Sequence, residues 1–214
     1  YVFDTDNFLN EERDYRLSVT NLITGKITTS ETNLVHNLTL MSSFNNPAYK
    51  MGFYSSTGDF SNTTVEWTHS QNGSIYQMTL FVNYTEYGSD TLLKTIQKVY
   101  PIIKYEGNPN LSQKIIGEEF FNFIAYEVKG DSINRRINNL SILFSVGSSV
   151  LNSYITINEP PTGIVQEREL FTNINGGIGL FTSRYNKLEE NIFLTTTTKQ
   201  AIATQLDSLN FMFP

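Results

Sequence analysis

The chain has 214 residues, a net charge of -6 and no cysteine. This length is enough for one large domain or two small ones, with a core that needs no covalent staples. The absence of cysteine excludes disulfide frameworks, thiolate metal sites and cysteine nucleophiles. Only 15 Lys and Arg residues stand against 21 acids, so we exclude nucleic acid as a partner, because surfaces that bind it concentrate basic side chains.

Neutral polar side chains dominate the composition. Asn, Ser and Thr are frequent, whereas charged residues make up 17% of the chain, a balance typical of secreted and cell-surface β proteins. No apolar run reaches the roughly 18 to 20 residues that a membrane-spanning helix needs. Tyr1 does not open a signal-peptide pattern, so we expect a processed product whose leader has been removed.

The first predicted elements are two strands joined by a turn. The segment DYRLSVTN alternates apolar and polar residues with period two, turns at Thr24-Gly25 and continues into KITTSET. Because this pair resembles the closing hairpin of an immunoglobulin-like sandwich, we assign residues 1–34 to the end of such a β domain and residues 35–214 to a β-rich α+β domain. An unpaired strand edge is a liability, so we expect upstream residues or a partner to cover the hairpin.

Three later segments alternate in the same way: YKMGF at 49–53, IYQMTLFVNY at 75–84 and NLSILFSV at 139–146. Before the second of these stands Asn72-Gly73, the strongest two-residue signal for a β-hairpin, since both central positions take positive φ. A hairpin that turns there predicts three cross-strand pairs: Trp67 with Met78, Val65 with Leu80 and His69 with Tyr76.

Helical segments are few. Ser112 is predicted to cap a helix through GEEFFNFIAYEVKG, in which Glu118 and Glu119 suit the positive end of the helix dipole and Gly130 ends the helix. Residues 148–156 form a weaker candidate that Pro160-Pro161 stops. Thr197 and Gln200 form a capping box for a last helix. The whole chain therefore predicts a mainly β fold with a few short helices, an α+β protein of antiparallel sheets or a sandwich.

The stretch NINGGIGLF at 173–181 admits two interpretations, a phosphate-binding loop or a bend between strands. Its glycines lack the G-x-G-x-x-G spacing, no Lys-Ser/Thr follows, and IGLFTSRY has the pattern of a strand rather than a helix. We therefore predict a hairpin that turns at Asn175-Gly176. Its cross-strand pairs are Phe171 with Leu180, Leu170 with Phe181 and Glu167 with Arg184.

In that hairpin the glycines leave room for another surface to approach the backbone. The candidate docking hairpin comprises Asn175, Gly176, Gly177, Gly179, Phe181 and Arg184.

Catalytic chemistry has few candidates. His36 and His69 are the only histidines, and the predicted register places His69 on an apolar face, where a hydrogen-bonded core histidine is expected. No G-x-S-x-G elbow presents a serine nucleophile. The acid pairs Glu11-Glu12, Glu118-Glu119 and Glu189-Glu190 are sequence neighbours that do not face one cleft. DTDN at 4–7 lacks the glycine and glutamate of a calcium loop. We expect no catalytic residue, no cofactor and no metal.

Several segments together resemble a Bacteroidota family of outer-membrane surface lipoproteins of unknown function, often associated with TonB-dependent transporters. The resemblance rests on DYRLSVTN…GKITTSET, on GEEFFNFIAYEV and above all on LNSYITINEPPTGIVQERELFTNINGGIGLFTSRY. It implies a lipidated cysteine, which would have to lie upstream of Tyr1, and a membrane contact through that lipid anchor alone. It assigns no functional residue.

Three functions stay open. The first is a non-enzymatic, lipid-anchored cell-surface protein at the outer membrane, an accessory subunit that docks on a β-barrel complex for transport, assembly or secretion. The second is a glycan-binding surface module, for which 12 Tyr, 15 Phe and one Trp supply stacking rings. The third is a carboxylate-dependent glycoside hydrolase. We rank them in that order.

Overall fold

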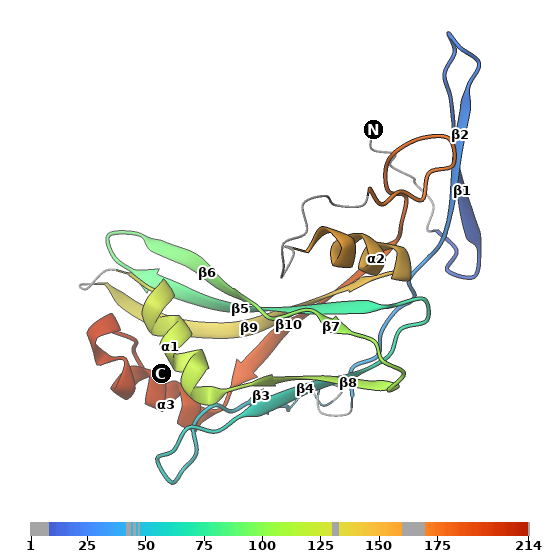
Figure 1. Ribbon diagram of the computed structural model, residues 1–214. Helices are drawn as coiled ribbons and strands as arrows, with labels where there is room; N and C mark the ends of the chain where they lie inside the picture. The colour runs from blue at the N-terminus through green and yellow to red at the C-terminus, as the bar shows by residue number, and fades with distance from the viewer. Residues whose placement is uncertain are drawn as a thin grey trace, which may run out of the picture.

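The computed structural model describes residues 9–41, 44, 46, 48–129, 133–159 and 170–213. Strands take up 44% of the chain and helices 18%, which confirms the predicted mainly β fold with short helices. Two small sheets, β1-β2 and β4-β8, accompany a six-stranded sheet with the order β3-β10-β9-β5-β6, in which β7 also pairs with β5. The β4-β8 sheet lies below the large sheet, and α2 lies above it (Figure 1).

The N-terminal hairpin joins β1 (Asp14–Thr20) to β2 (Ile27–Asn33) in antiparallel register. Gly25 has φ +70°, and the side chain of Asn21 accepts hydrogen bonds from the N–H groups of Ile23 and Thr24, so the predicted turn is confirmed. The hairpin projects from the body of the protein at the upper right of Figure 1. Its assignment to an incomplete immunoglobulin-like domain stays a prediction.

The predicted hairpin between the strands around residue 72 is wrong. Asn72 does reverse the chain with φ +62°, but β4 (Thr63–Thr68) and β5 (Ile75–Tyr87) enter different sheets. β4 pairs with β8 (Asn110–Ile115), so Trp67 lies opposite Leu111 rather than Met78. Asn72-Gly73 favours a local turn but does not determine which strands pair. β5 pairs along its whole length with β9 (Asn134–Gly147), which is much longer than β4.

The remaining strands complete the large sheet. β10 (Arg184–Leu194) runs antiparallel to β9 and carries β3 (Lys50–Met51) on its far edge. On the other side, β6 (Thr91–Val99) pairs with β5, and β7 (Ile103–Lys104) continues along the same strand. The parallel β3-β10 contact makes the sheet mixed.

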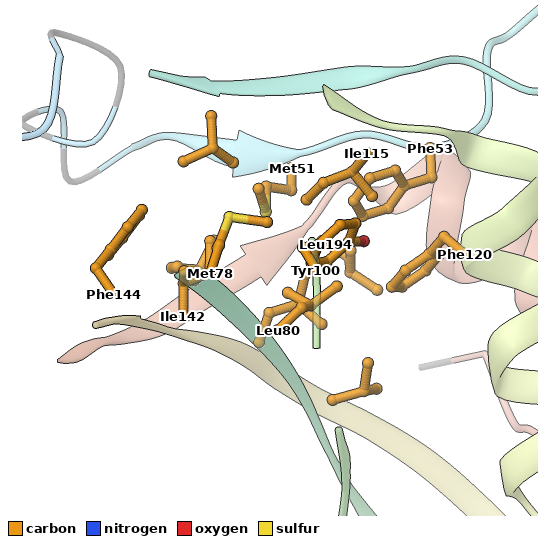
Figure 2. Close-up of a cluster of buried hydrophobic side chains, with 14 of the residues drawn as sticks. Met51, Phe53, Met78, Leu80, Tyr100, Ile115, Phe120, Ile142, Phe144 and Leu194 are labelled. Carbon is orange, nitrogen blue, oxygen red and sulfur yellow. The ribbon is translucent and has the colours of Figure 1, made fainter. Parts of the chain in front are cut away.

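The hydrophobic core fills the space between the large sheet, the β4-β8 sheet and helices α1 and α3 (Figure 2). The predicted alternation is confirmed, because the even-numbered apolar residues at 76–84 in β5 and 140–146 in β9 are buried, while Gln77, Thr79, Asn83 and Ser145 between them are only half-buried. The ten labelled core residues come from both halves of the chain: Met51, Phe53, Met78, Leu80, Tyr100, Ile115, Phe120, Ile142, Phe144 and Leu194.

Helix α1 spans Gly117–Glu127, which confirms the predicted helix, and it buries Phe120 and Ile124, but its start differs from the prediction. Ser112 lies in β8, and the N-cap is Ile116, which makes no side-chain capping bond. The helix begins at Gly117 because a Cβ there would come within 2.2 Å of the carbonyl oxygen of Ser61. The N–H of Gly117 donates to the side chain of Asn62 at 3.1 Å, so close packing and a side chain from a distant segment, and not Ser112, set this boundary. Gly130 lies outside the described residues.

Helix α2 (Ser149–Asn158) confirms the predicted helix at 148–156 and is capped by Ser148, whereas Pro160 and Pro161 lie outside the described residues. The N-cap of helix α3 (Thr196–Gln205) lies two residues before the predicted N-cap, Thr197. Its N-cap is Thr195, whose hydroxyl accepts from the N–H of Thr198. A 3-10 turn at Asp207–Leu209 follows.

Candidate functional site

The glycine-rich stretch is a compact loop and not the predicted hairpin. No described residue between 170 and 183 belongs to a strand, and β10 starts only at Arg184. Hydrogen bonds from two polar side chains hold the loop together, in place of the backbone hydrogen bonds of a strand pair. The hydroxyl of Thr172 accepts from the N–H of Gly179 at 3.1 Å and donates to the carbonyl of the same residue at 3.0 Å.

The second of these side chains is Asn173. Its carboxamide accepts from the N–H of Phe181 at 2.9 Å and donates to the carbonyl of Phe181 at 2.6 Å. Phe181 therefore lies opposite Asn173, and not opposite Leu170 as predicted. The carboxamide of Asn173 thus bonds both the N–H and the C=O of Phe181, the two backbone groups that a neighbouring strand would otherwise bond. In the sequence, the polar pair Thr172-Asn173 before the glycines indicated this side-chain bonding, which the period-two pattern alone does not reveal.

The loop docks on the N-terminal hairpin. Thr29 of β2 and Asn175 exchange two backbone hydrogen bonds, with the N–H of Thr29 donating at 3.1 Å and that of Asn175 at 2.7 Å. The hydroxyl of Ser30 adds a bond to the carbonyl of Asn173 at 2.7 Å. Residues far apart in the sequence thus extend the small sheet by one short segment, and in Figure 1 the loop lies beside β2.

The glycines make this approach possible. Gly176 has φ +75°, which a side chain would strain, and its missing Cβ would lie 3.5 Å from the carbonyl oxygen of Ile27. A Cβ on Gly177 would lie 3.1 Å from Ile174 and 3.3 Å from the methyl group of Thr28. The surface that comes close to the glycine backbone is therefore β2 of the same chain.

Several aliphatic side chains of the hairpin and the loop are exposed. Leu22 and Ile23 at the tip of the hairpin are 94% and 95% exposed, and Ile178 in the loop is 75% exposed. More than half of the surface of Val19 and Ile27 is also accessible. Val19 lies opposite Thr28 and Ile27 opposite Thr20, so these two side chains point to opposite faces of the hairpin. We call the exposed aliphatic residues of the tip and the loop, Leu22, Ile23 and Ile178, the hairpin-loop surface. Aliphatic residues at a hairpin tip depart from ordinary turn composition, which favours Gly, Asn, Asp, Ser and Pro.

Of the six predicted docking residues, the structure keeps five together. Asn175, Gly176, Gly177, Gly179 and Phe181 belong to the loop, with Phe181 half-buried. Arg184 is the first residue of β10, where it lies opposite Gly147 and lines a cavity below α2. Its predicted partner Glu167 lies outside the described residues.

Both histidines are engaged in structural contacts. Nδ1 of His69 lies 2.7 Å from the hydroxyl of Tyr76, and its ring stacks on Tyr105 with centroids 3.5 Å apart. Burial lowers the pKa of His69, because desolvation disfavours the charged imidazolium. Nε2 of His36 lies 3.0 Å from the carbonyl oxygen of Glu11 and ties the segment before β1 to the segment after β2.

One acid pair converges, contrary to expectation: the carboxylates of Glu11 and Glu12 lie 3.7 and 3.9 Å from Nδ1 of His36. The other two pairs do not converge within the described residues. Glu118 and Glu119 are exposed in the first turn of α1, and Glu189 lies 3.3 Å from Lys187 on β10. No group of three His, Cys, Asp or Glu side chains that could hold a metal occurs in the part of the chain that the structure describes. The DTDN segment lies outside that part. None of the helices described is both long and apolar enough to traverse a bilayer.

Comparisons of the chain with models of known protein families, with curated proteins and with solved structures found no match.

Proposed function

We propose that the protein is a non-enzymatic docking subunit of a cell-surface complex, lipid-anchored at the outer membrane, that binds a β-barrel protein of a transport, assembly or secretion machine. One observation carries the proposal: two aliphatic side chains, Leu22 and Ile23, stand almost fully exposed at the tip of a projecting hairpin. Apolar groups gathered on a protruding element are typical of contact sites for other proteins.

The hairpin is held in place for such a contact. On its inner edge the glycine loop binds Thr29 and Ser30, and at its base the side chain of Ser183 accepts from the N–H of Val35 at 3.2 Å. A surface that is ordered before binding loses less conformational entropy on association, so the same apolar contact yields a tighter complex.

The outer edge of the hairpin offers backbone hydrogen bonds as well. The N–H of Asn21 donates to the carbonyl of Lys26, so odd-numbered residues of β1 pair with β2. The N–H and C=O groups of Arg16 and Ser18 consequently point away from β2. No described residue pairs with this edge. A strand of the partner can therefore add to β1 while its apolar side chains contact Leu22 and Ile23.

Photo-crosslinking in the native membrane tests this proposal. A photoreactive amino acid placed at Leu22 is expected to form a covalent adduct with an outer-membrane β-barrel protein in cells of the source organism. The same amino acid at Thr57, an exposed residue in the turn after β3, serves as the matched control and is expected to give no adduct.

Two results would overturn the proposal. One is an absence of adducts at position 22 under conditions in which the protein is displayed at the surface. The other is migration of the protein, purified in mild detergent, as a free monomer with no barrel protein attached. A double substitution of Leu22 and Ile23 by Ser is expected to release the barrel protein and to leave the melting temperature unchanged, because both side chains are already in solvent.

A second candidate function, glycan binding, has its own observation. A hollow of about 500 Å³ lies between β6 and α1, and one of its walls carries Tyr126, which is 72% exposed, beside the half-buried Phe123. Gln97 and Asn122 add planar amides, so the hollow combines stacking rings with hydrogen-bonding groups. The remaining aromatic residues of the core point inward, which is why we rank this function second.

A glycan array separates the two functions. Tyr126→Ala is expected to abolish any glycan signal, whereas Tyr154→Ala, which removes an exposed ring on α2, is expected to retain it. An array on which the intact protein gives no signal would eliminate glycan binding.

A further inference from the structure

A cavity of about 260 Å³ lies between helix α2 and the outer face of the large sheet. Residues of β5, β9, β10 and α2, together with Ile102, line it: Ile75, Tyr76, Gln77, Ile102, Ser145, Gly147, Leu151, Ile155 and Arg184. The cavity is distinct from the hairpin-loop surface, and it contains the one predicted docking residue, Arg184, that the glycine loop does not include.

The register of the sheet explains how the cavity forms. Arg184, Gly147, Ile75 and Lys104 are direct neighbours on four adjacent strands, so they make one row across the outer face. Gly147 lies in the middle of this row, and α2 crosses close above it, because a Cβ on Gly147 would come within 2.8 Å of Leu151. The helix therefore lies in a trough with a basic side chain on each side.

The two basic side chains differ in their partners. Nζ of Lys104 lies 3.5 Å from a carboxylate oxygen of Glu159 and 3.2 Å from the hydroxyl of Thr156, so α2 itself neutralises this side. No carboxylate of the described residues lies within ion-pair distance of Arg184. Among the described residues that line the cavity, Arg184 is the one charged side chain, so its guanidinium group is available to a bound anion.

The walls of the cavity are mainly aliphatic. Ile75, Ile102, Leu151 and Ile155 supply its apolar lining, and α2 buries none of its own residues although it covers the sheet. Gln77 adds a polar side chain to the lining, and its amide nitrogen donates to the carbonyl of Tyr100 at 3.3 Å. An apolar space with a few convergent polar groups and one cation suits a small amphiphile with an anionic end.

We propose that this cavity binds an aliphatic monocarboxylate, with the carboxylate on Arg184 and the chain between α2 and Ile75. The volume equals that of about nine water molecules at roughly 30 Å³ each, so a medium-length chain fills it. Binding covers the half-exposed faces of Leu151 and Ile155 and thereby completes the burial of the helix.

Calorimetric titration of the full chain with octanoate, and with octanamide as its neutral analogue, tests the proposal. Octanoate is expected to bind at one site about tenfold more tightly than octanamide. This factor corresponds to about 1.4 kcal/mol, the contribution that we expect from one partly exposed ion pair. Arg184→Gln is expected to remove that preference. The matched control Arg136→Gln alters an exposed arginine of β9 outside the lining and is expected to keep the preference.

A cavity-filling variant keeps the test independent of charge. Ser145→Leu places an aliphatic side chain inside the cavity and is expected to abolish binding of both probes while the melting temperature is maintained or raised. Absence of saturable octanoate binding to the intact protein would overturn the proposal. Undiminished octanoate binding by a folded Ser145→Leu variant would equally overturn it, since the ligand would then occupy another place.

Discussion

The backbones of Thr29 and Asn175 exchange two hydrogen bonds, at 3.1 and 2.7 Å, across the joint between the N-terminal hairpin and the glycine loop. This contact makes the orientation of the hairpin depend on a loop that follows it by most of the length of the chain. Changes in the loop are therefore expected to affect the hairpin, and through it the proposed docking of a partner.

Gly177→Ala is expected to loosen this joint. The added methyl group would lie 3.1 Å from Ile174 and 3.3 Å from Thr28, so one of these neighbours must shift, at a cost of about 1 kcal/mol. Hydrogen exchange at the amide of Thr29 should accelerate, and crosslinking from position 22 should fall.

Gly88→Ala is the matched control for this substitution. Its nearest neighbour would be the carbonyl oxygen of Asp90 at 3.9 Å, so the protein should be unchanged or slightly more stable. Equal exchange rates in both variants would show that the packing at Gly177 does not hold the joint.

Asn173→Ala is expected to open the loop. It removes the two hydrogen bonds that the carboxamide makes to Phe181, at a local cost of about 1–3 kcal/mol. The exchange rate of the Phe181 amide is the direct measurement. Asn175→Ala in the same loop is the control, because Asn175 contributes its backbone to the joint. Retained protection of Phe181 in the first variant would contradict the assignment.

Arg135→Met is expected to lower the unfolding free energy by about 3–5 kcal/mol. The side chain of Arg135 is fully buried and donates to Glu86 at 3.0 Å, to the carbonyl of Leu209 at 2.8 Å and to that of Lys129 at 2.7 Å. Its loss leaves the carboxylate of Glu86, whose side chain is only 12% exposed, without its cation. Urea denaturation followed by the fluorescence of Trp67 measures the effect.

Two further variants separate the charge from the packing. Arg136→Met, at the exposed neighbouring position, should change stability by less than about 0.5 kcal/mol. Adding Glu86→Leu to Arg135→Met should restore part of the loss, because no uncompensated charge then remains. A double variant that is no more stable than Arg135→Met alone would assign the loss to the two carbonyl contacts instead.

The stability of the protein is expected to fall as the pH decreases below about 6.5, the ordinary pKa of histidine. Burial lowers the pKa of His69 in the folded state, so the unfolded chain binds a proton first and protonation favours unfolding. Nδ1 of His69 also lies 2.7 Å from the hydroxyl of Tyr76, which accepts from the N–H of Ser70, so the ring is held in this partly desolvated position.

His69→Gln isolates this contribution. Its unfolding free energy, measured by urea denaturation between pH 7.5 and about 5, should decrease less steeply than that of the unchanged protein. Identical slopes in the two proteins would assign the pH dependence to other groups.

Particular elements show which features of the fold the sequence predicts. Period-two alternation correctly placed β5 and β9 and chose their buried faces, and the Thr24-Gly25 turn and the α2 helix were also correct. The cap of α1 was wrong because packing of Gly117 on Ser61 sets its start. Loop residues 173–181 were misassigned as a hairpin because the side chains of Thr172 and Asn173 take the place of strand partners.

For β1, β2, β5 and β9 the sequence by itself determined the strand, and for β5 and β9 also the buried face, because alternation of apolar side chains is a local property that solvent exclusion acts on directly. Only the tertiary structure decided which strand pairs with which, that the glycine loop closes on β2, and that Arg184 lies beside a cavity with Lys104 across the trough. These outcomes depend on competition among distant segments for the same strand edge. The free energy of each strand pairing depends on the whole length of the paired strands and on the apolar surface that the partner strand buries.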